Sequence, residues 1–341
     1  MRFVKKFLIL LFSFLGTLFF CELFISSAKI AELSFAEYYD DIGKGLLKSR
    51  EFVNFNEGFS ILSTNEYRFV GDVVSKSKPK NTIRVALIGD SFVQGAQMFE
   101  RHTLSRIMED NLRLKSPNKV VEVLNFGRAG FNVGHMYAYQ KLLIEDFEPD
   151  YFIYFLSKED LVSDYSFPPL LPRTDIINDS LSISINVETS ELNKYQNTKF
   201  LTQNFTFFNI LNACRYKVNQ GETGGILFGK FYSKPQIKII ESEHVFEFDP
   251  ITSKIFENLS KNTIIINSNA SILPIKVEEK CVENGLLYWD MTYCFDELQK
   301  SGIIFNEWKA TNKLGHWNQY CHQKLGIEIA NKLNHLLDES D

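Results

Sequence analysis

Residues 88–95 read Ile-Gly-Asp-Ser-Phe-Val-Gln-Gly and follow an apolar run from Arg84 to Ile88. An unbroken apolar run of this length is typical of a strand buried on both faces of a sheet. Apolar residues recur at helical spacing from Leu104 to Leu112, so the chain turns from strand into helix just after Ser91. A serine at such a turn is a candidate nucleophile. Gly-Asp-Ser alone is weak evidence, because it arises by chance in roughly one chain in ten of this length.

Three other stretches place polar residues beside predicted strands or helices. They are Asn-Phe-Gly-Arg-Ala-Gly at 125–130, Ser-Lys-Glu-Asp at 157–160, and Gly-His-Trp-Asn-Gln-Tyr-Cys-His at 315–322. The first two follow predicted strands, and the third precedes an amphipathic helix. A serine early in the chain and a histidine 225 residues later are in the order of a split hydrolase site.

The alternation of strands and helices from Thr82 onward predicts a parallel sheet covered on both faces. The order is interrupted at about 165–250, where we expect an insertion over the edge of the sheet that binds ligands. Within it, Thr174 to Ile185 reads as a β-hairpin with Asn178 and Asp179 at its turn. We expect three segments: a membrane helix at 1–28, a linker at 29–80 and one α/β domain at 81–341.

Together these stretches resemble the SGNH hydrolases, also called GDSL esterases. Ser91 is similar to the nucleophile of that family, Gly130 to a glycine of its second block, and His316 to the histidine of its last block. The resemblance implies a three-layer α/β/α domain with a central parallel sheet. It also implies an ester hydrolase without a metal ion or organic cofactor.

The resemblance gives each residue a role. Ser91 attacks the ester and His316 acts as the general base. The N–H groups of Ser91 and Gly130 stabilise the oxyanion. Glu159 stands where the family has an asparagine in this oxyanion hole, and an ionised carboxylate accepts hydrogen bonds but cannot donate one. His322 is expected to be structural.

The family also has an aspartate two or three residues before the histidine, where this chain has Lys313 and Leu314. Neither side chain can accept a hydrogen bond from the imidazole. Asn312, Asp290 or Asp296 could replace the missing acid, or a backbone carbonyl near Lys313 could hold the ring. The sequence leaves these alternatives open.

The N-terminus carries Arg2, Lys5 and Lys6 before an apolar run from Phe7 to Phe20. Positive charge before an apolar run keeps the N-terminus in the cytoplasm and sends the rest across the membrane. An uncleaved anchor is favoured. The alternative is a cleaved signal peptide, because residues 26–28 are small, as a cleavage site requires. The domain is therefore expected outside the cytoplasm, tethered to the membrane.

The composition excludes one class of partner. The net charge of -5 leaves no basic face for nucleic acid. The expected substrate is an ester-bearing small molecule or an acylated polysaccharide, with acetyl groups on a cell-envelope glycan as the specific case. Two alternatives remain: a degenerate, non-catalytic domain that binds glycan or an envelope partner, and an O-acyltransferase that uses the same Ser91 and His316.

Cysteine usage leaves the redox state open. Four cysteines follow Cys21, an even number in a compartment that permits disulfides. Free buried thiols are one interpretation, and a bridge between Cys281 and Cys294 is the best of the possible pairings.

Overall fold

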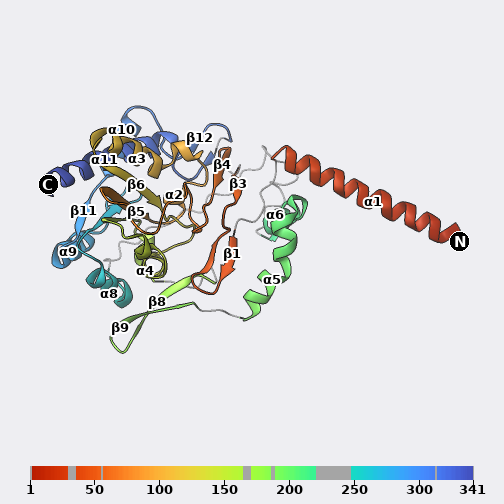
Figure 1. Ribbon diagram of the computed structural model, residues 1–341, viewed down its shortest axis with the longest axis horizontal. Helices are drawn as coiled ribbons and strands as arrows, with labels where there is room; N and C mark the ends of the chain where they lie inside the picture. The colour runs from red at the N-terminus through yellow and green to blue at the C-terminus, as the bar shows by residue number, and fades with distance from the viewer. Residues whose placement is uncertain are drawn as a thin grey trace. The chain divides into compact units, whose positions relative to one another are not determined.

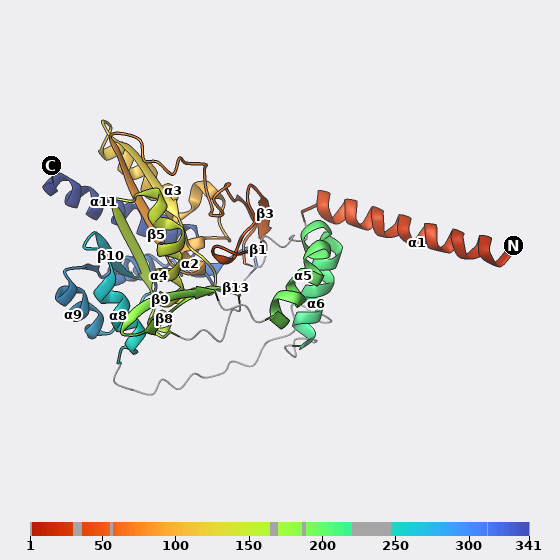
Figure 2. The ribbon, with the colours of Figure 1, turned by 60° about the horizontal axis from the view of Figure 1, so that its bottom comes forward.

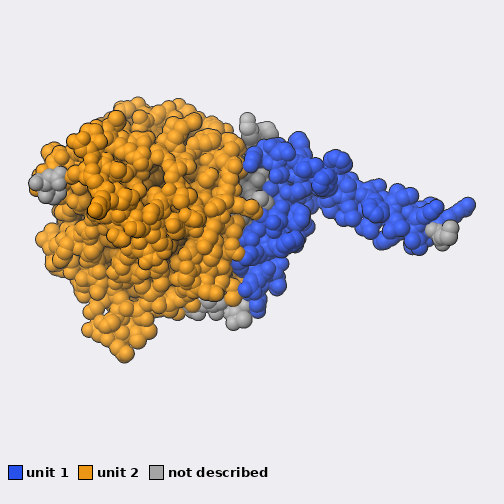
Figure 3. Space-filling view, in the orientation of Figure 1, with its two compact units in different colours: residues 1–35, 193–245 blue, residues 36–192, 246–341 orange. Residues whose placement is uncertain are grey.

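The computed structural model describes residues 2–29, 36–54, 57–163, 170–185, 189–219, 247–311 and 313–340. The chain divides into two compact units, which have different colours in Figure 3. The larger unit comprises residues 36–192 and 246–341, and the smaller one comprises residues 1–35 and 193–245. All the candidate site residues belong to the larger unit.

The larger unit is built on a parallel five-stranded sheet (Figure 1). Its strands in chain order are β5 (Thr82–Ile88), β6 (Val120–Asn125), β7 (Tyr151–Leu156), β10 (Thr263–Asn267) and β11 (Leu287–Trp289). They lie side by side in the order β11-β10-β7-β5-β6, so the first strand lies between the second and the third. This is the flavodoxin-like order, in which ligands bind at the carboxyl ends of the first and third strands. The predicted parallel sheet is confirmed.

Helices cover both faces of this sheet, because successive residues of a strand point to opposite sides. Val85 and Leu87 pack in one core beneath α3 (Leu104–Lys115), α10 (Thr292–Lys300) and α11 (Gln319–Ser340). Ala86 and Ile88 pack in the other, beneath α4 (Val133–Leu142), α8 (Pro250–Asn258) and α9 (Ile275–Asn284). Figure 1 shows these two groups of helices on opposite sides of the strands. The predicted three-layer α/β/α fold is confirmed.

The two cores also decide the state of the cysteines. Cys281 belongs to the core beneath α9, and Cys294 belongs to the core on the other face of the sheet. All five cysteines are free, so the bridge between Cys281 and Cys294 does not form.

Residues 36–80 are not the linker that the sequence predicted. They form β1 (Ala36–Tyr39) with β2 (Gly43–Leu46) and β3 (Glu51–Asn54) with β4 (Ser60–Ser63), each an antiparallel pair. Ile42, Leu46 and Leu62 are completely or almost completely buried. The sequence does not predict these strands, because four residues are too few to show a period.

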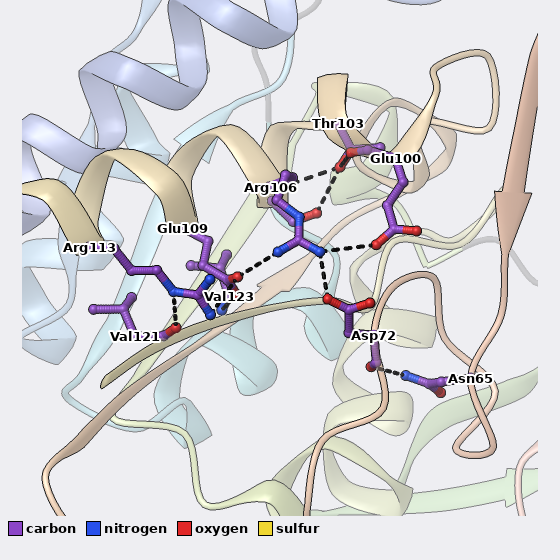
Figure 4. A network of polar contacts seen from close by, with 10 residues as sticks. Asn65, Asp72, Glu100, Thr103, Arg106, Glu109, Arg113, Val121 and Val123 are labelled. Carbon is purple, nitrogen blue, oxygen red and sulfur yellow. Dashed lines mark hydrogen bonds and ion pairs between the residues drawn. The ribbon is translucent and has the colours of Figure 1, made fainter. Parts of the chain in front are cut away.

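Polar contacts hold this N-terminal segment to α3, as Figure 4 shows, and also to the sheet. Arg106 on α3 donates to Asp72 at 2.5 Å and to Glu109 at 2.9 Å. The buried guanidinium of Arg84 pairs with Glu122 and donates to the backbone carbonyls of residues 75 and 76. Because Arg84 is completely buried, the loss of these partners would leave a charge without compensation.

The predicted hairpin at Thr174 to Ile185 is present. β8 (Pro172–Ile177) pairs with β9 (Ser180–Ile185), and Asn178 and Asp179 between them have φ values of 51° and 59°. Asn and Asp tolerate this left-handed conformation, which a two-residue hairpin turn of type I′ requires. Thr174 fixes the hairpin to α4 through a hydrogen bond to the carbonyl of Gly134.

The smaller unit contains α1 (Arg2–Ser27), α6 (Thr206–Asn219) and most of α5 (Thr189–Asn204). Figure 2 shows α5 and α6 side by side. α1 is long and apolar enough to cross a membrane, as a signal sequence would also be. Its Glu22 carboxylate accepts hydrogen bonds from the N–H groups of Thr206 and Phe207, at 2.8 and 2.9 Å. A carboxylate from α1 therefore caps the first turn of α6.

Candidate active site

Ser91 is the first residue of α2 (Ser91–Gln94), which begins where β5 ends. The Asp90 side chain caps this short helix by accepting from the N–H of Phe92 at 2.9 Å. Gly95 ends it in a left-handed conformation with φ of 62°. The tight turn puts Ser91 at the carboxyl edge of the sheet, beside the place where strand order reverses.

The loop after β6 is fixed directly to this turn. Asn125 donates to the carbonyl of Val93, and the Gln94 side chain accepts from the N–H of Ala129. A Cβ on Gly127 would lie 2.2 Å from the Gln94 nitrogen, so only glycine fits there. Gly130 follows with φ of 79° and is exposed.

Two N–H groups at this edge suit an oxyanion. The N–H of Ser91 lies in the first turn of α2, where backbone donors have no partner within the helix. In the part of the chain that the structure describes, neither this N–H nor that of Gly130 has an acceptor within hydrogen-bond distance. One donor belongs to α2 and the other to the loop after β6, and the Gln94 and Asn125 contacts hold these two segments together.

The loop after β7 places its two acidic residues differently. Glu159 begins the short 3-10 helix η3 (Glu159–Leu161), and its side chain is exposed. Asp160 is buried and accepts hydrogen bonds from the N–H and the hydroxyl of Ser157 at 2.8 and 2.9 Å. Burial, together with the nearby Asp90 carboxylate, raises the pKa of Asp160 to about 7. Burial likewise raises the pKa of Asp90, to about 6.

His316 follows a short antiparallel pair, β12 (Glu307–Trp308) and β13 (Lys313–Leu314). Trp308 donates from its indole nitrogen to the carbonyl of His316 at 2.9 Å. The Phe92 ring packs against the imidazole, with ring centroids 4.9 Å apart. Asn318 caps the final helix by accepting from the N–H groups of Tyr320 and Cys321. These contacts fix the backbone and the ring of His316 before any substrate binds.

The imidazole lies between Ser91 and an acid that the sequence did not indicate. His316 Nε2 is 2.8 Å from Ser91 Oγ, and Nδ1 is 2.9 Å from Glu57 Oε1. Glu57 Oε2 also accepts from the His316 backbone N–H at 2.9 Å. Burial raises the pKa of Glu57, but the hydrogen bonds from His316 outweigh it and hold the pKa below its usual value. Glu57 is therefore ionised at neutral pH.

Glu57 takes the place of the acid that the sequence predicts near His316. Asp290 instead accepts hydrogen bonds from Thr292, and Asn312 lies outside the described residues. No local pattern marks Glu57, because it stands in the stretch at 29–80 for which the sequence predicts a linker. The missing aspartate before His316 was the one signal that an acid had to come from elsewhere.

Two contacts hold the Glu57 turn against the β12–β13 hairpin. The Thr311 hydroxyl donates to the Glu57 carbonyl. Trp308 packs directly against Gly58, where an added Cβ would lie 2.3 Å from the indole ring. A Cβ on Gly315 would likewise lie 2.4 Å from the Glu57 carboxyl group. The hairpin thus leaves room for the acid and aligns it with His316.

His322 has the structural role that the sequence predicted. It is buried, and its Nδ1 accepts from the N–H of Leu104 at the start of α3. Burial, together with the nearby His316, lowers the pKa of His322 to about 3. His322 therefore joins α11 to α3 as a neutral side chain.

Comparisons with known proteins find only remote similarity to solved structures. No protein-family model and no curated protein matches the sequence. The central parallel sheet is the one that the resemblance implied, and Ser91 and His316 lie within hydrogen-bond distance, as their expected roles require. The chain has a parallel α/β/α fold with the flavodoxin-like strand order.

Similar solved structures include an acetylxylan esterase from Geobacillus stearothermophilus, with 14% identity, 75% of this chain and 96% of that chain covered, and a TM-score of 0.35. A protein assigned to the lipolytic G-D-S-L family from Desulfitobacterium hafniense is 11% identical, with coverages of 73% and 98% and a TM-score of 0.34. A two-domain esterase active on acetylated mannans is 13% identical over 76% of this chain, with a TM-score of 0.37. This chain covers 49% of that esterase and so spans about half its length.

Proposed function

We propose that the protein is a serine ester hydrolase of the SGNH type. The observation that supports it best is the chain of contacts from Ser91 Oγ through both ring nitrogens of His316 to Glu57. A hydroxyl, an imidazole and an ionised carboxylate in this order form the arrangement that activates serine in unrelated hydrolases.

Each residue then has a step in the reaction. Ser91 Oγ attacks the ester carbonyl carbon while His316 Nε2 takes its proton. Glu57 stabilises the imidazolium, and the N–H groups of Ser91 and Gly130 donate to the oxyanion. Collapse of the intermediate breaks the bond to the alcohol, which receives the proton from His316. A water molecule, activated by the same imidazole, then hydrolyses the acyl-enzyme and restores Ser91.

The direct test is labelling of the full chain in detergent with a fluorophosphonate, which reacts with activated serines. We expect one label, located on Ser91 by peptide mass, and none in Ser91→Ala. A matched control is Ser105→Ala, a buried serine of α3. No labelling of a folded wild-type protein would contradict the proposal.

We further propose that the substrate carries acetyl esters and belongs to a cell-envelope glycan. The acetylxylan and acetylated-mannan esterases among the similar structures agree with this choice, and a domain outside the cytoplasm would meet such glycans. An acyltransferase would use the same two residues, with a sugar hydroxyl in place of water. Product analysis with an acceptor sugar present separates these, since transfer leaves the acetyl group on the sugar.

A non-catalytic role in glycan binding is the second candidate. Glu159 favours it, because a carboxylate stands where the family has a donor to the oxyanion. The ionised Glu57 opposes it, because the acid that the last block lacks is supplied from the N-terminal segment. Turnover of 4-nitrophenyl acetate by wild type, lost in Ser91→Ala, would exclude the non-catalytic role.

We also propose that α1 stays in the mature protein as one membrane span, with residues from 29 onward outside the cytoplasm. Arg2, Lys5 and Lys6 support this orientation. The Glu22 contacts support retention, because cleavage after residue 28 would remove the cap of α6. N-terminal sequencing and extraction of membranes with salt test the proposal. A mature N-terminus at Lys29, with release into the wash, would contradict it.

A further inference from the structure

Arg128 is a buried cation that forms no ion pair with any described carboxylate. Its side chain follows Gly127 in the loop after β6, and the residue is 6% exposed. Nη2 donates to the carbonyl of Lys44 at 3.1 Å, but Nε has no hydrogen-bond partner in the described part of the chain. A buried charge is costly unless it is paired, and Arg84 shows the usual solution with Glu122.

Lys44 on β2 adds a second positive charge beside the first. Burial lowers the pKa of Lys44, and the positive charge of Arg128 lowers it further. Across the described ranges, neither Arg128 nor Lys44 forms an ion pair with a carboxylate. Two cations that repel each other in a partly dry environment favour the binding of an anion between them.

Two more buried donors in this neighbourhood lack acceptors. The Tyr139 hydroxyl and Arg68 Nε are buried and have no partner among the described residues. The other nitrogens of Arg68 bind Asp41, so its own charge is paired. Burial raises the pKa of the Tyr139 hydroxyl, and the nearby positive charges of Arg128 and Arg68 oppose this rise. Each of these donors can give a hydrogen bond to an anion.

The same loop joins this cluster to the candidate active site. The Arg128 N–H donates to the carbonyl of Gly89 at 2.9 Å, two residues before Ser91. Gly130, a proposed oxyanion donor, lies two residues after Arg128. The loop that carries Arg128 is therefore tied to the turn of Ser91 and also carries a proposed oxyanion donor.

We propose that Arg128 and Lys44, with the Tyr139 hydroxyl, bind a carboxylate of the substrate, so that the preferred ester is carried by an acidic sugar. A guanidinium offers a planar pair of donors that match the two oxygens of a carboxylate. The inference rests on the proposed function for the ester, but the binding of the carboxylate is independent of catalysis.

Binding is measured first, by calorimetric titration of the full chain in detergent with glucuronate and with glucose. We expect glucuronate to bind and glucose to bind at least tenfold more weakly. Arg128→Gln should weaken glucuronate binding at least tenfold, the usual scale for a hydrogen bond to a charged group. Lys48→Met, an exposed lysine nearby, is the control and should bind as wild type does.

Tyr139→Phe keeps the test valid if Arg128→Gln does not fold. This change removes one hydroxyl that has no partner in the described structure, so the fold should persist. We expect roughly a threefold to tenfold loss of glucuronate affinity from one hydrogen bond. Equal binding of glucose and glucuronate, or wild-type affinity in both variants, would overturn the proposal. Binding of inorganic phosphate but not glucuronate would also overturn it.

A kinetic assay then distinguishes this proposal from the proposed function. The measured quantity is the ratio of kcat/KM for acetylated glucuronate to kcat/KM for acetylated glucose. We expect Arg128→Gln to lower this ratio at least tenfold, whatever its effect on both rates. An unchanged ratio with good hydrolysis of both esters leaves the hydrolase intact and rejects the carboxylate site. Binding of glucuronate without hydrolysis of any ester rejects the hydrolase and leaves the carboxylate site intact.

Discussion

The Glu57 carboxylate accepts two hydrogen bonds from His316, one from the imidazole and one from the backbone N–H, across 259 residues of sequence. This double contact fixes both the ring and the chain that carries it. Glu57→Gln should therefore lower kcat by about 100-fold or more, since loss of the orienting acid in a serine triad costs up to about 10⁴. Hydrolysis of 4-nitrophenyl acetate measures the effect.

The matched control for Glu57→Gln is Glu66→Gln, an exposed glutamate of the same N-terminal segment. It should keep the wild-type rate. A Glu57→Gln enzyme with more than half of the wild-type kcat would show that Glu57 does not orient His316 during the reaction.

Gly315→Ala should reduce the rate through Glu57 without unfolding the protein. The added methyl group would lie 2.4 Å from the Glu57 carboxyl group, so the flexible acid must move away from His316. We expect a fall in kcat of about tenfold or more. The double variant with Glu57→Gln should be no slower than Glu57→Gln alone, because residues in contact are not additive. Full additivity of the two effects would refute this mechanism.

Glu159→Asn should raise turnover of a simple acetyl ester by about 100-fold at neutral pH, the scale of one restored oxyanion donor. The reason is that an amide donates a hydrogen bond whereas an ionised carboxylate repels the oxyanion. Lys158→Asn, an exposed neighbour on the same loop, is the control and should change little. An unchanged rate in folded Glu159→Asn would mean that the exposed side chain points away from the ester.

His322 should make the protein sensitive to acid. Its pKa of about 3 lies below the value of about 6.5 expected in the unfolded chain. Below pH 6.5 the unfolded chain binds a proton that the folded protein excludes, so the free energy of unfolding falls as pH drops toward 3. The loss between pH 7 and pH 5 should be about 2 kcal/mol.

Urea unfolding at pH 7 and pH 5 checks this prediction. His322→Gln keeps an acceptor for the Leu104 N–H and should show a smaller loss than wild type. The exposed His335→Gln, on the same helix, should lose as much as wild type. Equal losses in wild type and His322→Gln would assign the acid sensitivity to other groups.

The sequence alone predicts the three layers of the larger unit. The strands at Thr82–Ile88 and Tyr151–Leu156 are continuous apolar runs, and α11 has an apolar face, so short-range patterns reveal them. The Ser91 turn and the histidine before the last helix could be found in the same way. These features depend on residues within a few positions of one another, and a linear pattern therefore contains them.

Tertiary structure alone decided which groups meet at the edge of the sheet. Glu57 reaches His316 only because residues 36–80 pack into the larger unit through short strands and side-chain contacts that have no period. Arg128 meets Lys44 in the same way, through a loop and a strand far apart in the chain. Such contacts depend on the burial and charge of distant residues, which become neighbours only when the chain has folded.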